Sequence, residues 1–105
     1  MINNNEKLVI YLDASINSIF KILPLYEEQN LGVHVYIESL LFELYGLDDS
    51  VSIENSYEYI SLLSNLESIK KEVLREGSKK SVIKREVFKC INIIKNMITK
   101  LEEGE

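Results

Sequence analysis

Hydrophobic residues recur along this chain at steps of three and four positions, the spacing that places side chains on one side of an α-helix. They predict a first helix over residues 7–23, a second over 33–45 and a third over 55–76. A fourth helix is predicted to begin near Ser78 or Ser81, because apolar residues from there to Leu101 alternate steps of four and three. Gly46 and Gly77 are natural residues to end the second and third helices.

The sequence allows more than one conformation at two places in the first helix. Residues 8–12 form a continuous apolar run, which suits either a short strand followed by a helix capped by Asp13 or a helix throughout. We favour the helix. Pro24 has no backbone N–H and clashes with the preceding turn, so the helix is expected to kink or restart there.

Three polar residues of the third helix lead to more specific predictions. Asn55, with Glu58 three residues later, matches a capping box at the start of a helix. Lys70 falls inside the apolar side of this helix, where its aliphatic stem is expected to carry the charge out to solvent.

Short turns between four helices predict an all-α fold, a small antiparallel bundle of four helices, or of five if the chain breaks at Pro24. The whole chain, residues 1–105, is expected to form a single domain with frayed ends at 1–5 and 102–105. The composition agrees, since 46% hydrophobic and 28% charged residues are typical of a globular protein and too apolar for a disordered one.

Cysteine content and hydropathy indicate in which cellular compartment the protein is expected. Cys90 is the only cysteine, so an intramolecular disulfide scaffold is excluded and a reducing cytoplasm is expected. The first residues lack the pattern of a signal peptide, and no uninterrupted apolar run approaches the length of a membrane span. We therefore expect a cytoplasmic protein without membrane association.

Charge is distributed unevenly along the chain. The formal net charge is -5, which argues against a general nucleic-acid binder. Residues 1–78 carry five Lys or Arg against thirteen Asp or Glu, whereas residues 79–105 carry seven against four. Such polarity suits self-association of unlike ends, docking onto a charged partner, or a basic helix that packs across an acidic body.

Residues that support catalysis or metal binding are few. His34 and Cys90 fall on different helices, and Cys90 lies among apolar residues, as expected of a core thiol. His34 and Glu38 offer two ligands without a third, and Asp48–Asp49 begin a loop that lacks the glycine and the final glutamate of a calcium site. We expect no enzymatic activity, no metal site and no cofactor.

Apolar residues outside the main helical stripes indicate a binding surface. On a helical wheel, Val35, Phe42 and Tyr45 of the second helix, and Val82, Phe88 and Ile93 of the fourth, lie away from the stripes that face the core. A domain of this size cannot easily bury all of them. We predict that Val35, Phe42, Tyr45, Phe88 and Ile93 contribute to a protein-binding surface or a homodimer interface.

The fourth helix also carries a polar stripe. Its members follow one another at steps of three and four: Arg85, Lys89, Asn92, Asn96 and Lys100. Such a row suits DNA phosphates and base edges, or an acidic protein surface, but a solvated face is the simplest interpretation.

Three segments resemble small helical proteins of Firmicutes phages and mobile elements, of the anti-defence or regulatory type. They are YIESLLFELYGL at 36–47, YISLLSNLESIKKEVL at 59–74 and VIKREVFKCINIIKNM at 82–97. The last is similar to the terminal helix of some helical anti-CRISPR proteins. The resemblance implies a context in which such proteins bind and inhibit, or regulate, a host or competitor protein.

Together these features favour a non-enzymatic module that binds another protein, with a homodimer as the favoured oligomer. A dimeric DNA-binding regulator that uses the polar stripe is the first alternative. An immunity- or antitoxin-like helical bundle is the second.

Overall fold

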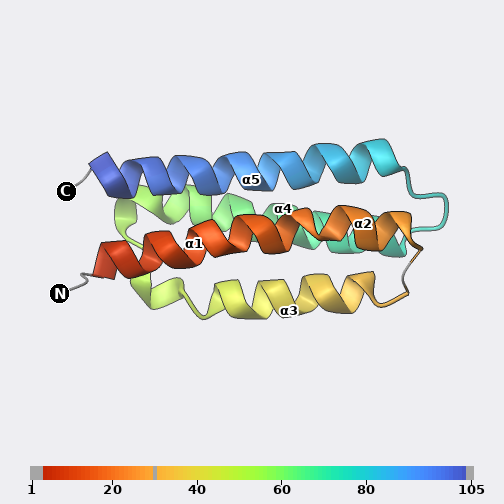
Figure 1. Ribbon diagram of the computed structural model, residues 1–105, viewed down its shortest axis with the longest axis horizontal. Coiled ribbons are helices and arrows are strands. Elements are labelled where there is room, and N and C mark those ends of the chain that lie inside the picture. The colour runs from red at the N-terminus through yellow and green to blue at the C-terminus, as the bar shows by residue number, and fades with distance from the viewer. Residues whose placement is uncertain (1–3, 30, 104–105) are drawn as a thin grey trace.

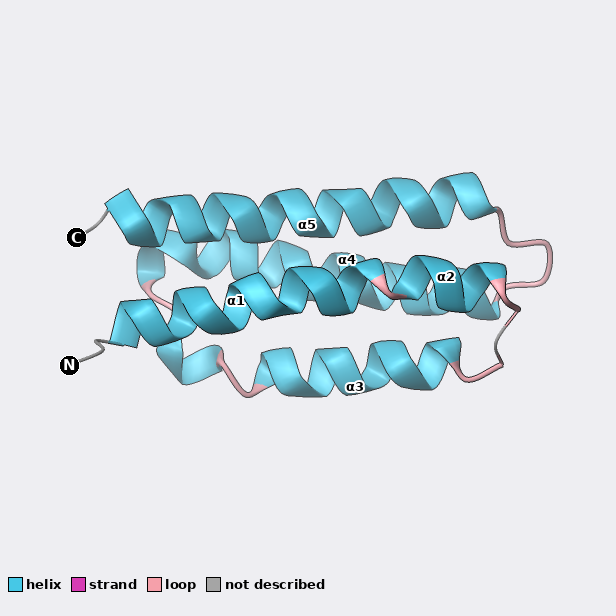
Figure 2. Ribbon diagram, viewed as in Figure 1, coloured by secondary structure: helices cyan, strands magenta, loops and turns pink. Residues whose placement is uncertain are grey.

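The computed structural model describes residues 4–29 and 31–103, and its elements there are helices joined by short loops (Figures 1 and 2). In chain order the elements are α1 (Asn4–Phe20), α2 (Ile22–Glu27), α3 (Val33–Tyr45), the 3₁₀ turns η1 (Asp48–Ser50) and η2 (Ile53–Asn55), α4 (Ser56–Leu74) and α5 (Lys80–Glu103). No strand occurs within these described residues, so the predicted all-α class is confirmed.

The helices run antiparallel and form an elongated bundle of 46 × 21 × 19 Å. In Figure 1, α1 and α2 form one continuous arm, α3 and α5 lie on either side of it, and α4 lies behind. The principal contacts join α4 to α5, α1 to α5 and α3 to α4. The fold is therefore the predicted four-helix bundle, in which the first of the four helical arms is divided into α1 and α2.

Residues 8–12 belong to α1, so the helical alternative is the correct one. Leu8 and Leu12 are one turn apart and both are buried, whereas Ile10 on the opposite side is 62% exposed. Packing against α5 therefore uses only part of this apolar run, and helical geometry separates its buried members from its exposed ones.

The first arm bends at Lys21, one turn before Pro24. Lys21 N donates to Asn17 O and Leu25 N donates to Lys21 O, each at 3.3 Å, so backbone hydrogen bonds continue around the bend. Pro24 lies in the first turn of α2, where backbone N–H groups have no partner within that helix. The expected kink is thus present, and the proline is accommodated without ending the arm.

The core runs along the length of the bundle and receives residues from every arm. Leu12, Ile37, Leu62 and Ile94, one from each arm, have no exposed surface. Cys90 is also fully buried, and burial raises the pKa of its thiol to about 12. The interpretation of Cys90 as a core residue is confirmed.

The start of α4 differs from the expected capping box. Asn55 occupies the N-cap position but makes no capping hydrogen bond with its side chain. Its Nδ2 instead donates to Met97 O of α5 at 3.5 Å, and Glu58 forms an ion pair with Lys100. The capping-box prediction is wrong because both side chains are used to join α4 to α5.

The helices extend further than expected at both ends. Residues 4–5 belong to α1 and residues 102–103 to α5, whereas the rest of the predicted frayed ends, 1–3 and 104–105, lies outside the described residues. The ordered bundle thus includes residues that composition alone assigns to loose ends.

One helical stretch among the described residues, Asn5–Glu27, is long and apolar enough to cross a membrane by length and composition alone, with a mean hydropathy of 1.5. We had expected no stretch of this length and hydropathy, because charged residues such as Asp13 interrupt the apolar run. Asp13 nevertheless lowers the mean hydropathy of the stretch only slightly. In the bundle, 22% of its most apolar window is buried. Leu8, Leu12 and Ile19 belong to the core, which explains part of this hydropathy.

Candidate protein-binding surface

Exposed hydrophobic side chains concentrate on α3 and α4. Among the described residues, eleven large hydrophobic side chains are exposed, and seven of them lie on α4 or on or just before α3. Six of the seven, all except Tyr57 in the first turn of α4, we call the α3–α4 apolar face: Leu31, Val35, Phe42, Tyr45, Ile60 and Leu74, with exposed fractions from 51% to 91%. Scattered single residues of this kind are ordinary, but a contiguous set marks an interaction surface.

Helical spacing aligns the members of this face in two rows. On α3, Val35 and Phe42 are seven residues apart, which is nearly two turns, so they face the same direction. On α4, Ile60 and Leu74 are separated by twice that spacing, with Glu67 midway. Each row therefore follows the axis of its helix.

An ion-paired lysine connects the two rows. Lys70 Nζ lies 3.8 Å from Glu38 Oε1 on α3 and 3.3 Å from Glu67 Oε2 on α4. Glu67 belongs to the α4 row and Glu38 lies four residues before Phe42, so the two rows border the same seam between the helices. Lys70 is thus paired at the edge of the core, where it was expected to reach solvent.

The remaining sides of α3 are covered, which explains why it is apolar nearly all round. Ile37 and Leu44 enter the core, and the Tyr36 hydroxyl donates a 2.7 Å hydrogen bond to Ser18 O of α1. Burial raises the pKa of Tyr36, an effect partly offset by the side chain of Ser18. Only the side of α3 with Val35 and Phe42 is left without a neighbour among the described residues.

The structure separates the predicted binding residues into two groups. Val35, Phe42 and Tyr45 are exposed together on α3. Phe88 on α5 instead packs edge-on against Phe20 of α1, with ring centroids 5.5 Å apart and 40% of Phe88 exposed. Ile93 is partly buried against the core, so the α5 residues do not join the α3 residues in one patch.

Sequence reasoning missed the contribution of α4. Neither Ile60 nor Leu74 was predicted to belong to the binding surface, yet their side chains are 64% and 61% exposed. The spacing of seven that links Ile60, Glu67 and Leu74 is a usable signal, because it defines a second stripe beside the one that packs inward.

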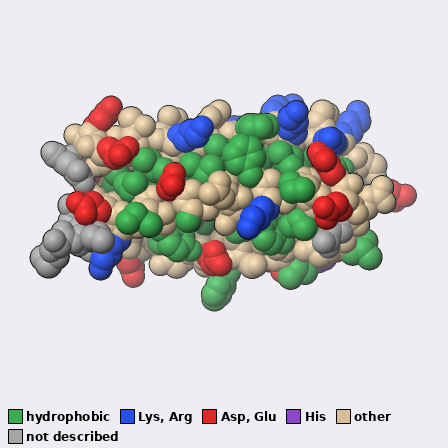
Figure 3. All heavy atoms as spheres, in the orientation of Figure 1, with side chains coloured by type: hydrophobic (Ala, Val, Ile, Leu, Met, Phe, Trp, Pro, Cys, Tyr) green, Lys and Arg blue, Asp and Glu red, His purple; other side chains and the backbone are tan. Residues whose placement is uncertain are grey.

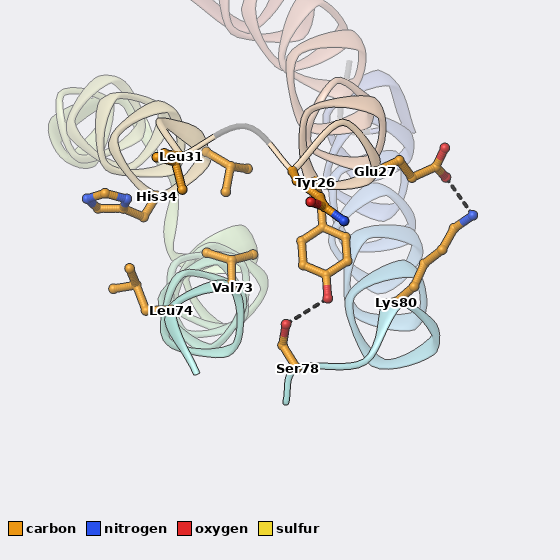
Figure 4. Close-up of a pocket in the computed structure, with 10 residues that line it drawn as sticks. Tyr26, Glu27, Leu31, His34, Val73, Leu74, Ser78 and Lys80 are labelled. Atoms are coloured by element: carbon orange, nitrogen blue, oxygen red, sulfur yellow. Dashed lines mark hydrogen bonds and ion pairs between the residues drawn. The ribbon is translucent and has the colours of Figure 1, made fainter. Parts of the chain in front are cut away.

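A pocket of about 820 Å³ lies at one end of this face, where α2, α3, α4 and the start of α5 meet (Figure 4). Leu31 and Leu74 line it together with Val33 and Val73. The Tyr26 and Ser78 hydroxyls are hydrogen bonded at 2.7 Å. Because two of its lining residues belong to the α3–α4 apolar face, the pocket extends that face to the end of the bundle.

The polar groups of the pocket are paired with one another or point apart. Glu27 and Lys80 form an ion pair of 2.8 Å. In Figure 4 the imidazole of His34 points away from Ser78, and Ser78 is bonded to Tyr26. The pocket therefore does not bring a histidine to a serine in the manner of a nucleophile and its base. Within the described part of the chain, no group of three or more His, Cys, Asp and Glu side chains is placed to hold a metal ion.

The predicted polar stripe lies on the outer side of α5. All five of its members are exposed: Arg85, Lys89, Asn92, Asn96 and Lys100. Lys100 is paired with Glu58, whereas Arg85 and Lys89 make no ion pair with any residue that the structure describes. In Figure 3 basic side chains gather over the first half of α5, while hydrophobic side chains follow α1 and its seam with α5.

The fold and this surface define a small helical bundle with an exposed apolar face. No protein-family model matches the chain, and no match was found among curated proteins or among solved structures.

Proposed function

We propose that this protein acts by binding another protein through the α3–α4 apolar face. The observation that carries the proposal is that six large hydrophobic side chains, each more than half exposed, lie on or just before two helices that pack against each other. Apolar residues that gather in this way are the feature from which the buried centre of a protein interface is built. A module of this kind acts on its partner by occupying a surface, as an inhibitor or regulator does.

Phe42 is the best single residue with which to test the proposal, because it is a large aromatic side chain that is 81% exposed. Phe42→Asp places a charge in the α3 row, and Phe42 is not part of the core. Ile10→Asp is the matched control, since Ile10 is also an exposed hydrophobic residue but lies on α1.

The experiment is affinity capture from lysate with the wild-type protein and both variants. We expect a captured protein that is retained by Ile10→Asp and weakened about tenfold or more by Phe42→Asp. Capture that is equal for Phe42→Asp and the wild type contradicts the proposal, as does the absence of any captured protein. Circular dichroism of both variants establishes that the bundle is folded.

The outer side of α5 favours nucleic acid as a second candidate partner. Lys84, Arg85, Lys89 and Lys95 have no ion-pair partner among the described residues, and Asn92 on the same helix is exposed. Binding through such cations must weaken steeply as salt rises, because phosphate contacts release counterions. DNA binding at low salt that is lost in Arg85→Gln/Lys89→Gln supports this candidate, and no binding at low salt removes it.

A further inference from the structure

We infer that the α3–α4 apolar face binds an amphipathic helix whose apolar stripe is flanked by Lys or Arg. This inference rests on the proposed function and adds the chemistry of the partner. It follows from the shape of the face, from the charge around it and from what a second copy of this chain can offer.

The two rows have the dimensions of a site for a helix. Ile60 and Leu74 are fourteen residues apart, so the α4 row is roughly 21 Å long, or about four helical turns. On α3, Val35 and Phe42 repeat at the spacing of seven that a partner helix uses for its own apolar stripe. A helix that lies along the seam can therefore contact both rows along its length.

The charge around the face is strongly acidic. Residues 31–74 carry eight Asp or Glu and two Lys or Arg, a net charge of -6, whereas the rest of the chain carries nine acids and ten bases, a net charge of +1. Lys70 is paired with Glu38 and Glu67, whereas Glu58 and Glu72 are paired with Lys100 and Arg75 from outside the segment. The whole net negative charge of the protein thus lies in the segment that forms this face, and it favours a basic partner.

A second copy of the chain is a poorer occupant. If two copies met through the same face, each would bring a segment of charge -6 against the other. The basic helix α5 of another copy has the right charge, but its apolar side is buried, and only Phe88 remains 40% exposed. Neither the α3–α4 apolar face nor α5 by itself therefore combines an exposed apolar stripe with positive charge.

The test uses two labelled synthetic helical peptides that share a leucine stripe and differ only in flanking residues, Lys in one and Glu in the other. Binding to the full chain is measured by fluorescence anisotropy at about 0.05 M and about 0.5 M salt. We expect the Lys peptide to bind about tenfold more tightly than the Glu peptide at low salt, with a smaller difference at high salt. Phe42→Asp should weaken the Lys peptide about tenfold, and Ile10→Asp should leave its affinity within about twofold.

The outcomes separate this inference from the proposed function. If the Glu peptide binds as tightly as the Lys peptide, or if neither binds, the basic-helix inference is overturned, while capture that depends on Phe42 still supports protein binding. If Phe42→Asp has no effect on capture, the proposed function itself fails. If light scattering shows a dimer that Phe42→Asp converts to a monomer, the occupant is a second copy and the inference is overturned.

Discussion

The hydroxyl of Tyr59 on α4 donates a 2.6 Å hydrogen bond to the backbone carbonyl of Leu44, in the last turn of α3. Carbonyl groups in the last turn of a helix have no partner within that helix, so this bond joins the end of α3 to the side of α4. Burial raises the pKa of Tyr59, and the nearby Asp48 carboxylate adds to the effect. The phenol therefore remains a donor throughout the neutral range.

Tyr59→Phe should lower the free energy of unfolding by about 0.5–1.5 kcal/mol. The value should not be larger, because Leu44 O also accepts a hydrogen bond from the backbone N–H of Leu47 and keeps a partner. Urea unfolding followed by circular dichroism measures the change. Tyr57→Phe is the control, since Tyr57 is 78% exposed, and equal losses in the two variants would contradict the structural role of the Tyr59 hydroxyl.

Leu12 and Ile10 offer a matched pair on α1. Leu12 has no exposed surface, so Leu12→Ala leaves a cavity in the core and should cost about 2–5 kcal/mol. Ile10 is 62% exposed, and Ile10→Ala should change the free energy of unfolding by less than about 0.5 kcal/mol. Comparable losses would mean that α1 packs in another rotation about its axis.

Stability should depend on pH through the ion pair between Glu58 and Lys100. The hydrogen bond from Lys100 and one from its own backbone N–H lower the pKa of Glu58 below its ordinary value of 4.5. A carboxyl group whose pKa is lowered by folding stabilises the protein above the unfolded-state pKa. That contribution is lost as the pH falls through the lower folded-state pKa.

Glu58→Gln should therefore reduce the loss of stability between neutral pH and acid. The cost near neutral pH should be about 0–1 kcal/mol, because the Lys100 side chain of the pair is 44% exposed, although that of Glu58 is only 17% exposed. Urea unfolding at a series of pH values measures both effects. Glu28→Gln is the control, since Glu28 is exposed and forms no ion pair with a described residue. If the stability of Glu58→Gln depends on pH in the same way as that of the wild type, the ion pair between Glu58 and Lys100 does not contribute to the pH dependence.

Cys90 should be unreactive in the folded protein. Its thiol is fully buried with a pKa of about 12, whereas modification requires an accessible thiolate that attacks the reagent. At about pH 8, modification of the native protein should be slower than that of the urea-unfolded chain by about a hundredfold or more, since it requires opening of the structure. Rapid labelling of the native protein would show that α5 is loosely packed.

The helices were predictable because hydrophobic spacing reports which side of each helix is buried. The series on α5 from Ile83 to Leu101 lines the core as its alternating spacing indicates. The capping box was not predictable in the same way, because Asn55 and Glu58 find partners on α5, a helix far along the chain. Sequence neighbours decide local hydrogen bonds only where no tertiary partner competes for the same groups.

The candidate surface was predictable on α3 and not on α4. The sequence identifies the exposed residues of α3 because the hydrophobic stripe that faces the core does not include them. They are Val35, Phe42 and Tyr45. Leu74 directly follows the partly buried Val73, so its exposure depends on where α3 begins beside it, which one helix considered alone does not reveal. Phe88 was expected to be unpartnered, but Phe20 lies against it.

The packing of α1 along α5 determines when the core can close during synthesis. α5 is the last of the described helices to leave the ribosome, and until then Leu8, Leu12 and Ile19 lack the neighbour that covers them. The nascent chain therefore carries the uncovered apolar helix α1 while α3 and α4 can already pair. That interval is when this protein most needs protection from aggregation, because exposed apolar surface in incomplete chains promotes self-association.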